Sequence, residues 1–92
     1  MKIIKTGRNL KLAEFTLEKE RVVTGSCSYL GKEWDYQQWS KPDKKNLFTL
    51  ILFNPGKSTE IIAVCECNPG YDAVGSIIHR FIDEVILTLG RN

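Results

Sequence analysis

The sequence predicts an α+β fold in which an antiparallel β-meander of about five strands is followed by one C-terminal α-helix packed across one face of the sheet. Turn residues recur at short intervals through the first two thirds of the chain, and the segments between them alternate in polarity or are rich in β-branched residues. After residue 68 the apolar period changes to that of a helix. Ninety-two residues accommodate one hydrophobic core, so we expect a single domain, 1–92, with strands within 1–67 and the helix at about 69–89.

Two strands are expected in the first third of the chain. Residues 11–18, KLAEFTLE, alternate apolar and polar side chains, which is typical of a half-buried strand. Residues 21–30, RVVTGSCSYL, are rich in β-branched residues, and Gly25 stands where we expect a β-bulge. The sequence GKE at 31–33 then allows the chain to reverse.

Three further strands are separated by turn sequences. The third, 34–39 (WDYQQW), is short and is followed by the turn composition of 40–46. The fourth, 47–53 (LFTLILF), is apolar on both faces and predicts a central strand. It is expected to be covered on both sides, or covered on one side and in contact with a partner on the other. A turn at 54–58 leads to the fifth strand, 59–67. Alternation divides this last strand between two faces, with Ile61, Ala63, Cys65 and Cys67 on one and Ile62, Val64 and Glu66 on the other.

The last part of the chain has the pattern of one amphipathic helix. Asn68 is a candidate N-cap with Pro69 at the first helical position, Asp72 is a rival N-cap, and Gly90 is a natural C-terminal stop. A helix with a wide apolar face is expected to lie across a sheet. The expected apolar arc consists of Tyr71, Val74, Ile78, Phe81, Ile82, Val85, Ile86 and Leu89, whereas Ile77 and Leu87 fall outside it, either under loops or exposed to a partner.

The composition is that of an ordinary globular protein. Apolar residues make up 42% and charged residues 26% of the chain, which argues against intrinsic disorder. The net charge of +2 is too small to indicate nucleic-acid binding by itself. No apolar run is long enough to span a membrane, and the first residues lack the apolar region of a signal peptide. We therefore expect a cytoplasmic protein whose cysteines are reduced thiols.

The sequence NPGKST at 54–59 has the ending of a phosphate-binding P-loop. That motif requires a first glycine at the position that Ile51 occupies, and it requires a helix to follow. A strand pattern follows instead, so we interpret the segment as a polar hairpin turn.

The residues that could support catalysis or metal binding are not arranged for it. Cys65 and Cys67 share a strand face that is expected to point into the core, whereas His79 and Asp83 lie on the polar side of the helix. Cys27 lies on a strand, without a helix N-terminus to lower its pKa. We therefore expect no metal site, no cofactor and no enzymatic activity.

Residues 33–45, EWDYQQWSKPDKK, contain both tryptophans and are the candidate binding segment. Tryptophan and tyrosine combine a large apolar area with a polar group and are enriched where a surface is buried on binding. Lysines nearby would attract acidic partners. The expected partner-binding residues are Trp34, Tyr36, Gln38, Trp39, Lys41, Lys44 and Lys45.

Alternation along the third strand puts the two tryptophans on opposite faces. Trp34 and Tyr36 share one face and Trp39 lies on the other, so one tryptophan must face solvent, a partner or the far side of the sheet. In the alternative interpretation, Trp34 and Tyr36 complete the core while Trp39 packs against Lys41 or Pro42 at the edge.

Two functions are compatible with this segment. The first is a small, non-catalytic protein-binding module of the inhibitor, immunity or accessory type, which recognises another protein or a second copy of itself. The second is the binding of single-stranded nucleic acid through sheet aromatics and lysines. Acidic residues interleaved with the lysines leave the segment only weakly basic, which favours the first function.

Overall fold

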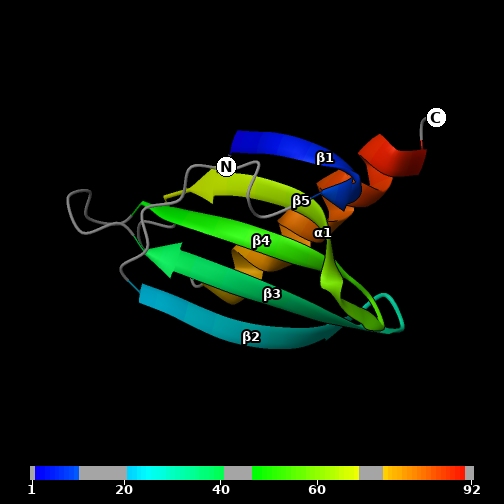
Figure 1. Ribbon diagram of the computed structural model, residues 1–92, viewed down its shortest axis with the longest axis horizontal. Coiled ribbons are helices and arrows are strands. Elements are labelled where there is room, and N and C mark those ends of the chain that lie inside the picture. Colours follow the sequence, from blue (N-terminus) through cyan, green and yellow to red (C-terminus); the bar gives the residue numbers. More distant parts are fainter. Residues whose placement is uncertain (1, 11–20, 41–46, 69–73, 91–92) are drawn as a thin grey trace.

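The computed structural model describes residues 2–10, 21–40, 47–68 and 74–90, and Figure 1 shows them as one antiparallel sheet with one helix behind it. The strands that these residues form lie in the order β1-β5-β4-β3-β2, and every neighbouring pair is antiparallel. This arrangement confirms the predicted α+β class. The elements are β1 (Lys2–Leu10), β2 (Arg21–Tyr29), β3 (Lys32–Ser40), β4 (Phe48–Asn54), β5 (Lys57–Cys67) and α1 (Val74–Gly90).

The first strand is one that the sequence pattern did not reveal. β1 pairs with β5 at the edge of the sheet opposite β2, and its pairing shifts register between Ile3 and Lys5 and again between Thr6 and Leu10. These irregularities interrupt the alternation by which a strand is recognised in a sequence. The strand that was expected at 11–18 lies outside the described residues.

The β2–β3 hairpin is regular throughout, and the expected bulge at Gly25 is wrong. The two strands pair without interruption from Arg21 with Ser40 to Tyr29 with Lys32. Gly25 lies opposite Tyr36, and a Cβ atom on Gly25 would stand 2.5 Å from Tyr36 Cζ. Glycine leaves room here for the tyrosine ring, which lies across the backbone and would have to shift for a larger residue, so the glycine does not mark a bulge.

β4 is the central strand that the sequence predicted. Leu50 and Leu52 belong to the cluster that faces α1, whereas Ile51 and Phe53 belong to a second cluster on the other face. All four are buried. The sheet therefore packs apolar side chains on both of its faces.

The expected division of β5 between two faces is wrong at its start. Leu52 pairs with Ala63 and the next residue of β4, Phe53, pairs with Ile61, so Ile62 is one residue more than β4 can match. This bulge turns Ile62 toward the helix-facing cluster and leaves Ile61 in the second cluster. Alternation resumes afterwards, and Cys65 and Cys67 lie in the helix-facing core as expected.

The NPGKST segment forms the turn between β4 and β5. Asn54 pairs with Lys57 across Pro55 and Gly56, and Gly56 has a φ of 78°. A strand follows the turn, so the interpretation as a hairpin is confirmed.

α1 lies across one face of the sheet, on its far side in Figure 1. Its buried residues are Ile77, Ile78, Phe81, Ile82 and Val85. The buried arc is therefore rotated from the expected one, because it includes Ile77 and leaves Ile86 exposed. No described helix is long and apolar enough to cross a membrane. Of the residues expected at the start of the helix, Pro69 and Asp72 lie outside the described part of the chain.

Candidate functional site

Both tryptophans of the candidate segment are buried within the chain. Trp34 is 4% exposed in the helix-facing cluster, and its Nε1 donates a hydrogen bond to the carbonyl oxygen of Tyr29 at 2.9 Å. Trp39 is 8% exposed in the second cluster, and its Nε1 donates to Oε1 of Gln37 at 3.1 Å. The prediction that they lie on opposite faces is confirmed. Neither presents its ring to solvent, because each completes a cluster of its own.

The remaining predicted contact residues are only partly accessible where they are described. Tyr36 and Gln38 are half-buried, and the Tyr36 ring packs over Gly25 toward the helix-facing cluster. Lys41, Lys44 and Lys45 lie outside the described residues. The structure thus gives the aromatic residues of β3 a packing role, and the accessible part of the hairpin is its outer strand and its tip.

The hairpin loop determines which backbone groups of β2 point outward. Leu30 and Gly31 have φ values of 52° and 73°, as the two central residues of a type I′ turn do. In a two-residue loop the flanking pair, here Tyr29 and Lys32, is the hydrogen-bonded pair that closes the hairpin. Backbone groups then alternate in direction along the strand. The residues whose N–H and C=O groups point away from β3 are Val22, Thr24, Ser26 and Ser28.

Among the described residues, this outer edge of β2 is unpaired and carries no charge from Val22 to Tyr29. The opposite edge differs, because β1 carries the exposed Lys2 and Lys5 and two register irregularities. Lysines and bulges are the usual means of preventing a sheet edge from pairing with another chain. One edge of the sheet is protected in this way and the other is not.

The tip of the hairpin exposes a large apolar side chain. Leu30 is 59% exposed and takes a left-handed backbone conformation, which costs a non-glycine residue about 1–2 kcal/mol. Asparagine or glycine would fit this position better. A strained conformation that displays an apolar side chain to solvent does not stabilise the fold, and such positions concentrate at functional sites.

A side-chain contact fastens the end of β2 to the helix. The Tyr29 hydroxyl donates to Oδ1 and Oδ2 of Asp83 at 2.9 and 3.0 Å, and its ring stacks on His79 with ring centroids 4.4 Å apart. The hydrogen bond to Asp83, with desolvation and the carboxylate charge, raises the pKa of Tyr29. Sequence reasoning grouped His79 with Asp83 but missed Tyr29, because 54 residues separate it from Asp83.

The thiols are not activated. Burial raises the pKa of Cys65 to about 12, with the nearby Cys67 adding to the shift, and burial also raises the pKa of Cys67. Burial and the charge of Glu33 raise the pKa of Cys27. All three are free thiols. Within the described ranges, no three His, Cys, Asp or Glu side chains gather closely enough to hold a metal ion.

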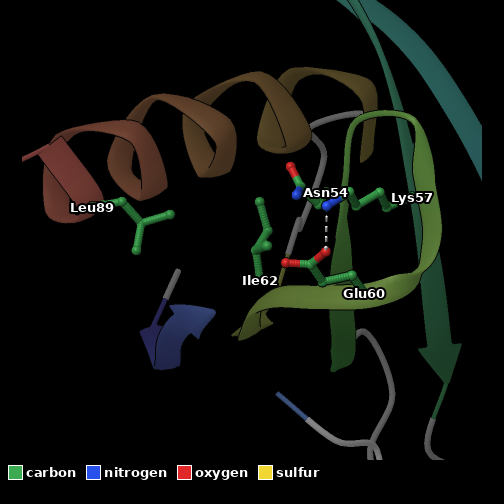
Figure 2. A pocket seen from close by; sticks show the side chains of 5 residues that line it. All are labelled: Asn54, Lys57, Glu60, Ile62 and Leu89. Carbon is green, nitrogen blue, oxygen red and sulfur yellow. Dashed lines mark ion pairs between the residues drawn. The ribbon is translucent and has the colours of Figure 1, made fainter. Parts of the chain in front are cut away.

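A surface hollow of about 310 Å³ lies beside the β4–β5 turn (Figure 2). Asn54, Lys57, Glu60, Ile62 and Leu89 line it. Lys57 Nζ and Glu60 Oε2 form an ion pair at 3.6 Å, so the two charged groups of the hollow face each other. The hollow has no nucleophile paired with a base, and it suggests no reaction.

Comparison of the chain with models of known protein families, with curated proteins and with solved structures finds no match. The geometry described above is therefore the basis for a functional proposal.

Proposed function

We propose that the chain is a small, non-catalytic protein-binding module whose contact surface is the β2–β3 hairpin. The observation that carries this proposal is Leu30, an exposed apolar side chain held at the hairpin tip in a conformation that leucine disfavours. The open edge of β2 supports it, because an extended segment of a partner can add to such an edge through backbone hydrogen bonds.

This surface differs from the one expected from the sequence. The tryptophans contribute indirectly, because they pack β3 onto both layers of the core and so hold β2 in place. The contact residues become the tip and the outer strand. A role for Lys41, Lys44 and Lys45 at the rim remains part of the proposal, since these residues follow β3 directly.

The proposal includes the class and the compartment of the protein. A small domain whose described residues form no catalytic arrangement fits the inhibitor, immunity or accessory type of binding protein. Three free thiols are favoured by the reducing environment of the cytoplasm, which supports an intracellular location. Binding of single-stranded nucleic acid has less support, because both indole rings are buried and cannot stack on bases.

The decisive experiment separates stability from binding at the hairpin tip. Leu30→Asn should stabilise the fold by about 0.5–1 kcal/mol, because asparagine tolerates the left-handed conformation. The same substitution should weaken partner capture about tenfold or more, because it removes the exposed anchor. Urea unfolding gives the first quantity, and quantitative pull-down from cell extract gives the second.

Leu87→Gln is the matched control. Leu87 is 55% exposed, about as much as Leu30, but it lies on α1 in an ordinary helical conformation. Its substitution should leave capture unchanged. Nuclease treatment of the extract distinguishes the partner classes, since loss of capture after treatment would indicate nucleic acid. Equal capture by the Leu30→Asn variant and the original chain would contradict the proposal.

A further inference from the structure

We infer that the partner of the β2 edge is a second copy of the chain, whose β2 pairs antiparallel with the first to join the two sheets. This inference rests on the proposed function, because it assigns one part of the proposed contact surface, the outer edge of β2, to a second copy and leaves the tip at Leu30 to the captured protein. It depends on three features of β2: the direction of its backbone groups, the side chains that face one another, and its lack of charge.

The direction of the backbone groups selects one register. In an antiparallel pair, a residue that points its N–H and C=O outward must face another outward residue. All four outward residues of β2 find partners when Val22 faces Ser28 of the second copy and Thr24 faces Ser26 of the second copy. A shift of two residues in either direction leaves one of them without a partner on each strand. One register therefore forms the most hydrogen bonds.

The same register pairs compatible side chains. Gly25 of each copy faces Gly25 of the other on the two-fold axis, so the strands meet without a side-chain clash at the centre. Val23 faces Cys27 of the second copy in a non-hydrogen-bonded pair, where Cα atoms approach to about 4.5 Å. Both residues lie on the α1 side of the sheet, and Val23 is 43% exposed in the single chain. Pairing covers this apolar side chain with an apolar neighbour.

Charge explains why the second copy is accepted at β2 and why association stops there. Within the paired part of β2 no like charges face each other, because β2 is uncharged from Val22 to Tyr29 and the nearest acids among the described residues, Glu33 and Asp35, lie one strand inward on β3. The β1 edge carries the exposed Lys2 and Lys5 and an irregular register. It cannot extend the sheet in the same way. The result is a closed two-fold dimer with both helices on one face, not a fibre.

The strength of the dimer follows from the size of the contact. One pair of edge strands buries less surface than a standard protein interface. We therefore expect a dissociation constant on the order of 10 μM, which is accessible to sedimentation velocity.

Two matched substitutions test the edge. Val23→Lys introduces a charge at the proposed contact, and Ile4→Lys introduces the same charge on β1, where Ile4 is 44% exposed. Sedimentation velocity of the full chain over a range of concentrations should show a reversible dimer for the original sequence and for Ile4→Lys. Val23→Lys should raise the dissociation constant about 100-fold while far-UV circular dichroism stays unchanged. An unchanged constant in Val23→Lys would overturn the inference.

Cross-linking tests the register independently. In the Val23→Cys variant, the new thiol faces the native Cys27 of the second copy at a Cα separation within disulfide range. Mild oxidation with copper phenanthroline should give a covalent dimer on non-reducing gels. Thr24→Cys places the thiol on the opposite face of the sheet and should react at least about tenfold more slowly. Equal rates for the two variants would show that the register is wrong.

The outcomes separate this inference from the proposed function. A chain that stays monomeric at all concentrations, yet captures another protein in a manner sensitive to Leu30→Asn, would overturn self-pairing and support the hairpin as a binding surface. The opposite result is a dimer that Val23→Lys disrupts, together with protein capture that Leu30→Asn does not change. It would support self-pairing and overturn the role of the hairpin tip.

Discussion

Truncation of Trp39 distinguishes a packing role from a contact role for this side chain. Trp39 is 8% exposed and contacts the second cluster, which includes Ile51, Phe53 and Val64. A tryptophan buries roughly 150–250 Å² of surface, and at about 25 cal/mol per Å² this corresponds to an upper limit of about 4–6 kcal/mol. Measured losses for aromatic-to-alanine substitutions in cores are about 3–5 kcal/mol. We expect Trp39→Ala to cost about 3–4 kcal/mol, because the half-buried amide of Gln37 can turn toward solvent when its indole partner is removed.

The assay is urea unfolding followed by far-UV circular dichroism, since fluorescence would lose one of the two reporters. A domain of this size is stable by roughly 5–14 kcal/mol, so the variant should remain folded with a midpoint far below that of the original chain. Trp39→Phe keeps an aromatic ring in the cluster and should cost only about 1–1.5 kcal/mol. A loss within about 0.5 kcal/mol for Trp39→Ala, the range of an ordinary surface site, would refute the packing role and return Trp39 to the list of partner contacts.

Two further predictions concern the packing of β2 and the alkaline limit of stability. Gly25→Ala should lower the free energy of unfolding in urea by about 1–3 kcal/mol, because the added Cβ would stand 2.5 Å from Tyr36 Cζ. In a Tyr36→Leu background this loss should largely disappear. If the losses from the two substitutions simply add, the contact between Gly25 and Tyr36 is contradicted. The free energy of unfolding should fall as pH rises from about 9 toward 12, because the pKa of Cys65 is raised from 9.0 to about 12 in the folded chain and the unfolded chain loses its proton first. In urea titrations at a series of pH values, Cys65→Ala should reduce the fall of the unfolding free energy with pH. If the fall is as steep in the variant, other titrating groups cause it.

Most of the fold could be predicted from local patterns. β4 and α1 are long apolar or amphipathic segments, and for such segments the sequence period follows the burial pattern directly. The errors occur where one residue changes the register. Ile62 forms a bulge that no turn residue marks, and Gly25, which looked like a bulge, instead makes room for Tyr36 from the neighbouring strand. Both depend on contacts between strands, which a single sequence does not contain.

The candidate site was predicted in part, for a related reason. The sequence located the hairpin and placed Trp34 and Trp39 on opposite faces, and both results hold. It treated exposure of at least one tryptophan as a strong option because a one-sided sheet has one core. This sheet has apolar clusters on both faces, so opposite faces no longer imply exposure. The sequence did not point to Leu30, because the residue is distinguished by its positive φ value. A leucine rarely adopts a positive φ, so the residue type gives no sign of it.

The two-residue loop at the end of β2 connects the proposed binding tip with the edge of β2 that no described strand pairs with. Because Leu30 and Gly31 alone connect the strands, Tyr29 and Lys32 must be the closing hydrogen-bonded pair. Because backbone groups alternate in direction along a strand, this pair determines that every second residue from Val22 points its N–H and C=O groups away from β3. If the closing pair moved by one residue, the N–H and C=O groups of Gly25 and its alternate neighbours would point outward instead. Gly25 would then itself be part of a hydrogen-bonded pair, and it could no longer lie on the two-fold axis between such pairs. The conformation that strains Leu30 is therefore also the one that makes β2 self-complementary. Relief of the strain by Leu30→Asn keeps the two-residue loop and the pairing of β2 with β3, so it should leave dimerisation intact in sedimentation velocity.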